Sequence, residues 1–181
     1  MKVYLVRHAI AENHPTIPDP PRIGATKAKA KILGSYGDPE RALTEEGKTK
    51  MTRGAQGLRK LKVGLDLVLS SPLRRARETA EIVAQELGGL KVEIAQALAP
   101  GGEPSEVVAL LRRHHNLHAM AVVGHEPDLG QLTSFLLTGS TDACHISFKK
   151  GGVACLDGDF DEDSAACSLL WLMPPKMLRS L

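Results

Sequence analysis

The chain opens with Met1-Lys2-Val3-Tyr4-Leu5-Val6-Arg7-His8. Four apolar, strand-forming residues end abruptly at Arg7 and His8, which predicts a buried strand with two polar residues at its carboxyl end. Similar apolar runs alternate with helical patterns further along, at residues 65–70, 90–94, 120–123, 152–157 and 167–173. Strands that alternate with helices indicate βαβ units. We therefore predict an α/β fold of three layers, with a mostly parallel central sheet and helices on both faces.

Length and composition narrow the class of protein. With 181 residues, 43% of them hydrophobic, the chain can form one domain over residues 1–181, with a Pro- and Lys-rich excursion at about 13–41. A net charge of +2 gives no bias toward nucleic acid or anionic membranes. No apolar run approaches the roughly 18 residues of a membrane span. Arg7 comes too early for a secretory signal, and three cysteines without Cys-x-x-Cys spacing argue against disulfides or structural zinc. We expect a cytoplasmic protein.

Ligands of open α/β sheets bind beyond the carboxyl ends of the strands, so the residues that follow each strand are the site candidates. Arg7 and His8 follow the first strand, and His125 follows the run at 120–123. Ser71-Pro72 predicts the cap of a helix that carries Arg75 in its first turn. A cation there opposes the helix dipole unless an anion binds beside it. The alternative for Arg75 taken alone is a surface ion pair.

Two arginines and two histidines at one edge suit phosphoryl transfer. A guanidinium can hold a phosphoryl group through two hydrogen bonds. A neutral imidazole can attack phosphorus and form a phosphohistidine intermediate, which water then hydrolyses. A second imidazole, if protonated, can donate a hydrogen bond to the phosphoryl oxygens. This chemistry requires no metal and no other cofactor.

Five motifs occur along the chain in the order Arg7-His8-Ala9, Leu43-Thr44-x-x-Gly47, Ser71-Pro72-x-x-Arg75-Ala76-x-x-Thr79, Leu98-x-Pro100-x-Gly102-Glu103 and Val123-Gly124-His125-Glu126-Pro127. In these motifs and their order the chain resembles the histidine phosphatase (phosphoglycerate mutase-like) superfamily, and within it the short SixA-like phosphohistidine phosphatases. The resemblance covers nearly the whole chain except residues 13–41. It implies a hydrolase in which His8 is the phosphorylated nucleophile and Arg7, Arg75 and His125 complete the phosphate pocket.

Larger relatives carry an acidic residue in an insertion that roofs the site, and residues 95–120 are too few to hold one. Glu103 is a candidate general acid or rim residue, or else caps the following helix. His14 is a candidate rim contact. We expect metal-independent hydrolysis of phosphohistidine on a protein in signal transduction, releasing inorganic phosphate. The alternatives are a general phosphomonoesterase for small phosphorylated metabolites and a non-catalytic phospho-ligand binding module.

A second histidine group, His114-His115-x-x-His118, allows a metal-binding interpretation because two of its members could share a helix face. It lacks the His-Glu-x-x-His pattern of known helical zinc sites. Cations are favoured at the C-terminus of a helix, so the group is better explained as the end of the preceding helix.

Overall fold

The structure, a computed structural model, describes residues 1–13, 39–160 and 167–181. Candidate residue His14 and most of the predicted excursion at 13–41 lie outside the described residues. The described strands are β1 (Lys2–Arg7), β2 (Leu67–Ser70), β3 (Val92–Ile94), β4 (Ala119–Gly124), β5 (Val153–Gly158) and β6 (Cys167–Met173).

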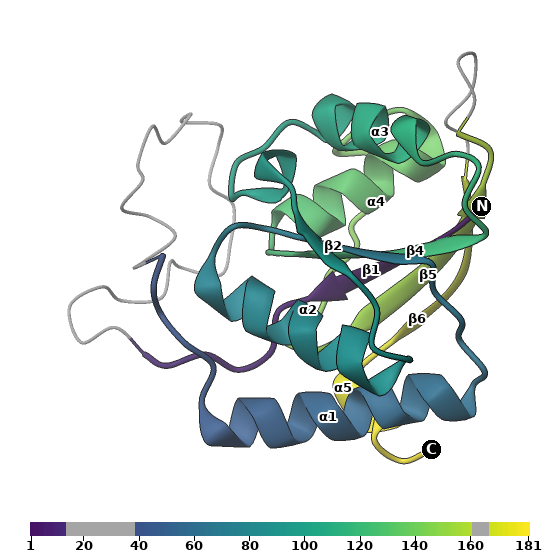
Figure 1. The fold of residues 1–181 in the computed structure, drawn as a ribbon. Helices are drawn as coiled ribbons and strands as arrows, with labels where there is room; N and C mark the ends of the chain where they lie inside the picture. The colour runs from purple at the N-terminus through teal and green to yellow at the C-terminus, as the bar shows by residue number, and fades with distance from the viewer. Residues whose placement is uncertain (14–38, 161–166) are drawn as a thin grey trace.

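These strands form one mixed sheet in the order β3-β2-β4-β1-β5-β6 (Figure 1). Strand β4 pairs in parallel with β1 on one side and with β2 on the other, and β2 pairs in parallel with β3. Strand β5 runs antiparallel to β1, and β6 runs antiparallel to β5. The predicted α/β class with a mostly parallel central sheet is confirmed.

Helices cover both faces of the sheet, as predicted (Figure 1). Residues of β4 alternate between the two resulting cores: Ala121 and Val123 pack toward one, and Met120 and Val122 toward the other. A strand buried on both faces reads as a continuous apolar run, which is what the sequence shows here. One face carries α1 (Glu45–Lys60), α2 (Arg74–Glu86) and α5 (Pro175–Leu178), and the other carries α3 (Pro104–Arg113) and α4 (Asp128–Thr138), preceded by the short helix η1 (Gln96–Leu98).

The start of α1 holds the segment that follows His8. Thr44 caps the helix by accepting the Gly47 N–H at 2.9 Å, and its own N–H donates to the Ile10 carbonyl at 3.0 Å. A Cβ at Gly47 would lie 2.0 Å from that same carbonyl oxygen, so only glycine lets the two backbones approach. The segment after His8 is thereby fixed from outside the sheet.

The start of α2 differs from the prediction. Ser71 is not its cap: the N-cap position is Leu73, without a side-chain cap hydrogen bond. The Ser71 hydroxyl instead lies 2.8 Å from a ring nitrogen of His125 and accepts the Leu73 N–H at 3.4 Å. The prediction was wrong because the Ser71 hydroxyl has a tertiary partner. The Arg74 N–H in the first turn of α2 donates instead to the Pro39 carbonyl at 3.0 Å.

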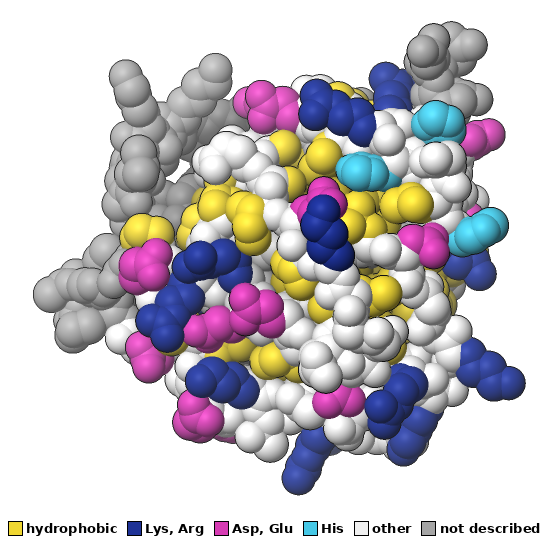
Figure 2. All heavy atoms as spheres, viewed as in Figure 1, with side chains coloured by type: hydrophobic (Ala, Val, Ile, Leu, Met, Phe, Trp, Pro, Cys, Tyr) yellow, Lys and Arg dark blue, Asp and Glu magenta, His cyan; other side chains and the backbone are white. Residues whose placement is uncertain are grey.

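On the face shown in Figure 2, basic and acidic side chains are intermixed, with no extended patch of one sign. Surface ion pairs include Lys48–Glu45 and Lys91–Glu93, both at 2.8 Å. In the described parts of the chain, no helix has the length and apolar character needed to cross a membrane.

Replacement of Gly47 by alanine tests the contact between α1 and the segment after His8. We expect Gly47→Ala to lower the free energy of unfolding by about 1–3 kcal/mol or more, because the new methyl group meets the Ile10 carbonyl. Gly54→Ala is the matched control: it lies in the same helix, has open space around its Cβ position, and should be neutral or stabilise by up to ~1 kcal/mol. Urea denaturation measures both; equal stability of the two variants would contradict the contact.

Candidate active site

Three strand ends meet at one edge of the sheet because β4 lies between β1 and β2. The His8 N–H donates to the Gly124 carbonyl at 3.0 Å, and the Ser71 N–H donates to the Val123 carbonyl at 3.0 Å. The rings of His8 and His125 consequently lie next to each other, with centroids 5.1 Å apart and planes inclined by 53°. The structure thus brings together the chain segments that the sequence singled out.

His8 is buried and oriented, with 5% of its surface exposed. Its Nδ1 lies 2.8 Å from the Ala9 carbonyl oxygen. A carbonyl can only accept, so Nδ1 carries the proton and Nε2 of the neutral ring keeps its lone pair. Burial, then the neighbouring His125 and the charge of Arg75, lower the pKa of His8 well below 6.5. The ring is therefore neutral at physiological pH and has a nucleophilic nitrogen.

His125, 2% exposed, has one satisfied and one unsatisfied ring nitrogen. Its Nε2 lies 2.8 Å from Oγ of Ser71, and its buried Nδ1 has no hydrogen-bond partner. The Ser71 hydroxyl can donate its proton to Nε2, and in that arrangement the ring proton lies on Nδ1. Burial, followed by the charges of Arg75 and Arg7, lowers the pKa of His125 to about 3. The unpartnered Nδ1–H is suited to an oxyanion.

Arg75 lies in the first turn of α2 and is only 2% exposed. The turn that carries it is tied to the segment after His8 through Thr79. The Thr79 hydroxyl donates to the Arg75 carbonyl at 2.7 Å and accepts the Ala9 N–H at 3.1 Å. The first turn contains no acidic residue, so a buried guanidinium and the positive end of a helix lie at the same edge. Both favour a bound anion.

Arg74, the residue before it, lies at the surface. Its Nε donates to Oε1 of Glu78 at 2.8 Å, and Oε2 of Glu78 accepts the Leu43 N–H at 2.7 Å. Arg74 therefore makes a surface ion pair, whereas Arg75, for which such a pair was the alternative, is buried.

Glu103 is not brought to the histidines by any contact of the described residues. It is exposed at the N-cap position of α3 and makes no side-chain cap hydrogen bond, so the expectation of a capping carboxylate is wrong. Its neighbours Gly102 and Pro104 line a small pocket together with Gly124 and His125. The segment that carries Glu103 therefore lies beside His125, while the Glu103 side chain itself is exposed.

Some contributors to the site were missed from the sequence. Arg41 is a third arginine whose charge lowers the pKa of His125, and nothing in the sequence around it signals this role. Ser71, Thr79 and Glu126 belong to motifs already quoted, so a search for the hydrogen-bond partners of the motif residues could have found them. Glu126 accepts N–H groups from Phe148 and Gly130.

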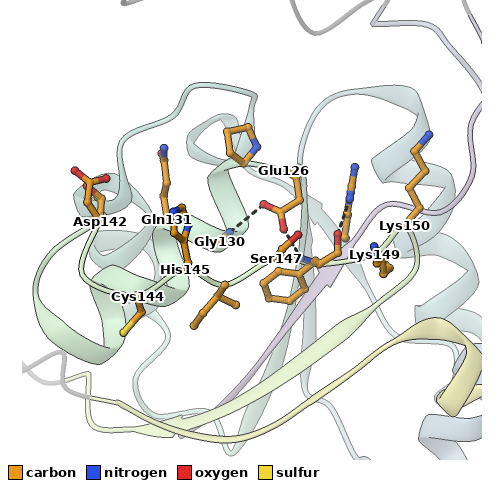
Figure 3. Close-up of a pocket in the computed structure, with 14 residues that line it drawn as sticks. Glu126, Gly130, Gln131, Asp142, Cys144, His145, Ser147, Lys149 and Lys150 are labelled. Carbon is orange, nitrogen blue, oxygen red and sulfur yellow. Dashed lines mark hydrogen bonds between the residues drawn. The ribbon is translucent and has the colours of Figure 1, made fainter. Parts of the chain in front are cut away.

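A cavity of about 1050 Å³ opens beside Arg7 (Figure 3). Its walls come from the start of α4 and from the loop between α4 and β5. Polar side chains line it, including Gln131, His145 and Lys149. It is far larger than a phosphate group and leaves room for the remainder of a substrate.

Within the described ranges, no group of three or more His, Cys, Asp or Glu residues is placed to hold a metal ion. In the histidine group at 114–118, Nδ1 of His115 lies 2.9 Å from the Arg112 carbonyl. That contact fits the predicted helix C-terminus, where α3 ends at Arg113.

Comparison with known proteins establishes the family to which this chain belongs. Residues 3–99 match the family model of the histidine phosphatase superfamily (branch 1). An uncharacterized protein of Picosynechococcus sp. is 32% identical over 155 residues, covering 84% of this chain and 82% of its own length. The chain therefore belongs to the histidine phosphatase superfamily.

Solved structures narrow the assignment within the family. The protein histidine phosphatase SixA, in complex with tungstate, superimposes with a TM-score of 0.76 and 27% identity over 98% of this chain and 99% of its own. The alpha-ribazole phosphatase of Shigella flexneri shares the fold, with a TM-score of 0.70 and 19% identity over 97% of each chain. This chain is a phosphatase of the SixA-like branch, and its substrate is a phosphorylated compound from which it releases phosphate.

Acid titration tests the buried state of His125. The unfolded chain binds a proton on this ring near pH 6.5, while the folded protein does so only near pH 3. Between these values the unfolded state holds the extra proton, so stability falls as pH decreases from 6.5 toward 3. We expect the free energy of unfolding of the wild type to drop across this window by a few kcal/mol more than that of His125→Gln. Urea denaturation at pH 7, 6, 5 and 4 measures this, and parallel curves would contradict it.

Proposed function

We propose that this phosphatase hydrolyses phosphohistidine on a signalling or phosphotransfer protein, without a metal, through a phosphohistidine intermediate on His8. The observation that carries the proposal is the state of His8: a buried neutral ring, held through Nδ1 by the Ala9 carbonyl, that lies next to His125. Arg7, Arg75 and the Nδ1–H of His125 are the proposed ligands of the phosphoryl oxygens.

In the first step, Nε2 of His8 attacks phosphorus, and the bond between phosphorus and the substrate's ring nitrogen breaks. The electron pair of that bond returns to the substrate ring, which leaves as imidazole. The two guanidinium groups and the Nδ1–H of His125 balance the charge on the three equatorial oxygens. Because Nδ1 of His8 donates to a carbonyl, the positive charge that develops on its ring is stabilised.

In the second step, water attacks the phosphorus atom on His8. The bond between phosphorus and Nε2 breaks, its electron pair restores the lone pair of Nε2, and dihydrogen phosphate leaves with both protons of the water. Fixed donors serve both steps, because each passes through the same arrangement of equatorial oxygens.

The choice of phosphohistidine rests on the leaving group. A substrate ring that carries a proton on its second nitrogen departs as neutral imidazole, whereas an alkoxide needs a proton from an acid. Among the described residues, no carboxylate is hydrogen-bonded to His8 or His125, and Glu103 is exposed at the start of α3. The cavity beside Arg7 supports a polypeptide as the carrier of the phosphoryl group, since it provides room beyond the phosphate pocket.

A comparison of two substrates tests the proposal. With chelator present, we expect turnover of a phosphohistidine-bearing protein to exceed that of an alkyl phosphate such as glycerol phosphate by about 100-fold or more, because only the alkoxide leaving group of the ester needs a proton from an acid. His8→Ala should lower turnover by about 1000-fold or more. The matched control His115→Ala removes an exposed imidazole and should stay within about two-fold of wild type.

Each other outcome overturns part of the proposal. Comparable or faster turnover of the ester would favour a general phosphomonoesterase. Loss of all turnover with chelator would contradict a metal-independent reaction. No turnover of either substrate, with phosphate still bound, would favour a binding module.

A further inference from the structure

Glu126, the residue after His125, has a role that the phosphoryl chemistry leaves unexplained. Its carboxylate is half-buried between the start of α4 and the loop that precedes β5 (Figure 3). Oε1 accepts the Phe148 N–H, and Oε2 accepts the Gly130 N–H at 3.3 Å. Burial raises the pKa of Glu126, and these two N–H groups and the charge of Arg7 oppose that rise. A carboxylate that accepts on both oxygens beside a guanidinium is placed to organise its surroundings.

The backbone of Phe148 connects Glu126 to Arg7. The Phe148 carbonyl accepts a hydrogen bond from Nη1 of Arg7, so consecutive peptide groups of Phe148 contact Glu126 and Arg7 in turn. The Phe148 side chain is fully buried in the core on the α3/α4 face. The ring and the Glu126 carboxylate therefore fix the direction of the carbonyl to which the guanidinium is bound.

The same loop also holds the backbone of β1. The Gly151 N–H lies within hydrogen-bonding distance of the Arg7 and His8 carbonyls, at 3.1 and 3.2 Å, and the Arg7 N–H donates to the Gly152 carbonyl at 3.1 Å. Main chain and side chain of Arg7 are thus both attached to one loop. Glu126 joins that loop to the end of β4, from which His125 projects.

The chemistry explains why the residue is a carboxylate. Both of its partners are N–H donors, and a carboxylate can accept from both at once. Glutamine has the same size but offers one acceptor oxygen, and its NH₂ group would oppose the second N–H. A Cβ at Gly130 would lie 2.3 Å from the Ile146 carbonyl oxygen, which shows how closely α4 and this loop approach.

We propose that Glu126 is a positioning residue that acts through the Phe148 backbone to aim the Arg7 guanidinium at the phosphate pocket. This inference rests on the proposed role of Arg7 in phosphate binding, and it deepens that role. It does not depend on which phosphorylated substrate the enzyme hydrolyses.

Glu126→Gln tests the proposal through its effects on KM and kcat. A misaimed Arg7 binds the phosphoryl group less well both before and during the reaction, so KM should rise about ten-fold while kcat changes less than about three-fold. A merely structural role would reduce the fraction of folded enzyme, which lowers kcat and leaves KM unchanged. The matched control Glu81→Gln removes an exposed carboxylate of α2 and should change neither constant. If Glu126→Gln does not fold, Glu126→Asp keeps the charge, shortens the reach to Phe148, and should raise KM similarly.

A double-mutant cycle with Arg7→Ala, read by the affinity for inorganic phosphate, completes the test. If Glu126 acts through Arg7, Glu126→Gln weakens phosphate binding about ten-fold in the wild type and has little effect once Arg7 is absent. Additive effects, or a fall in kcat at constant KM, would overturn the proposal. Failure of the proposed function gives different results. The Arg7→Ala variant would then bind phosphate as well as the wild type does, or phosphohistidine would not be turned over although the double-mutant cycle still shows coupling between Glu126 and Arg7.

Discussion

Positive charge buried at the carboxyl edge of the sheet is the constraint on which the rest of this structure depends. Arg75 is 2% exposed in the first turn of α2, and its charge acts on both His8 and His125. Burial of a guanidinium is costly unless negative charge pairs with it. Both imidazoles beside it stay neutral, and the guanidinium lies at the positive end of the α2 dipole. The guanidinium and the helix N-terminus favour an incoming phosphoryl dianion, which reverses the sign of the electrostatic cost.

The surrounding contacts keep this unfavourable arrangement from relaxing. Thr79 ties the first turn of α2 to Ala9, and the first turn of α1 packs through Gly47 against the carbonyl of Ile10. On the other side, the loop before β5 binds Arg7 through main chain and side chain. Rigid elements therefore hold His8 from three directions. This preorganisation reduces the reorganisation needed when charge develops on the phosphoryl oxygens.

Much of the fold could be predicted from the sequence, because buried strands read as short apolar runs and the polar residues after them identify the ligand edge. That argument found Arg7, His8, Arg75 and His125. It could not determine which hydrogen-bond partner a side chain takes when two are available. Ser71 could cap α2 or contact His125, and in the structure it contacts His125. The order of the strands in the sheet could not be predicted from the sequence. The same holds for the exposure of Glu103 at the start of α3 and for the action of the Arg41 charge on His125, because both depend on the tertiary fold.

Direct detection of the phosphoryl group on the enzyme tests the central claim, that His8 is the nucleophile. Enzyme mixed with excess phosphohistidine substrate is quenched in alkali, where phosphohistidine is stable, and the phosphorylated peptide is identified by mass spectrometry. The account predicts a phosphoryl group on His8 that forms and decays fast enough to support steady-state turnover, and none on the other histidines. A phosphoryl group on a different residue, or full turnover with no phosphorylation of His8 at any time point, would contradict it.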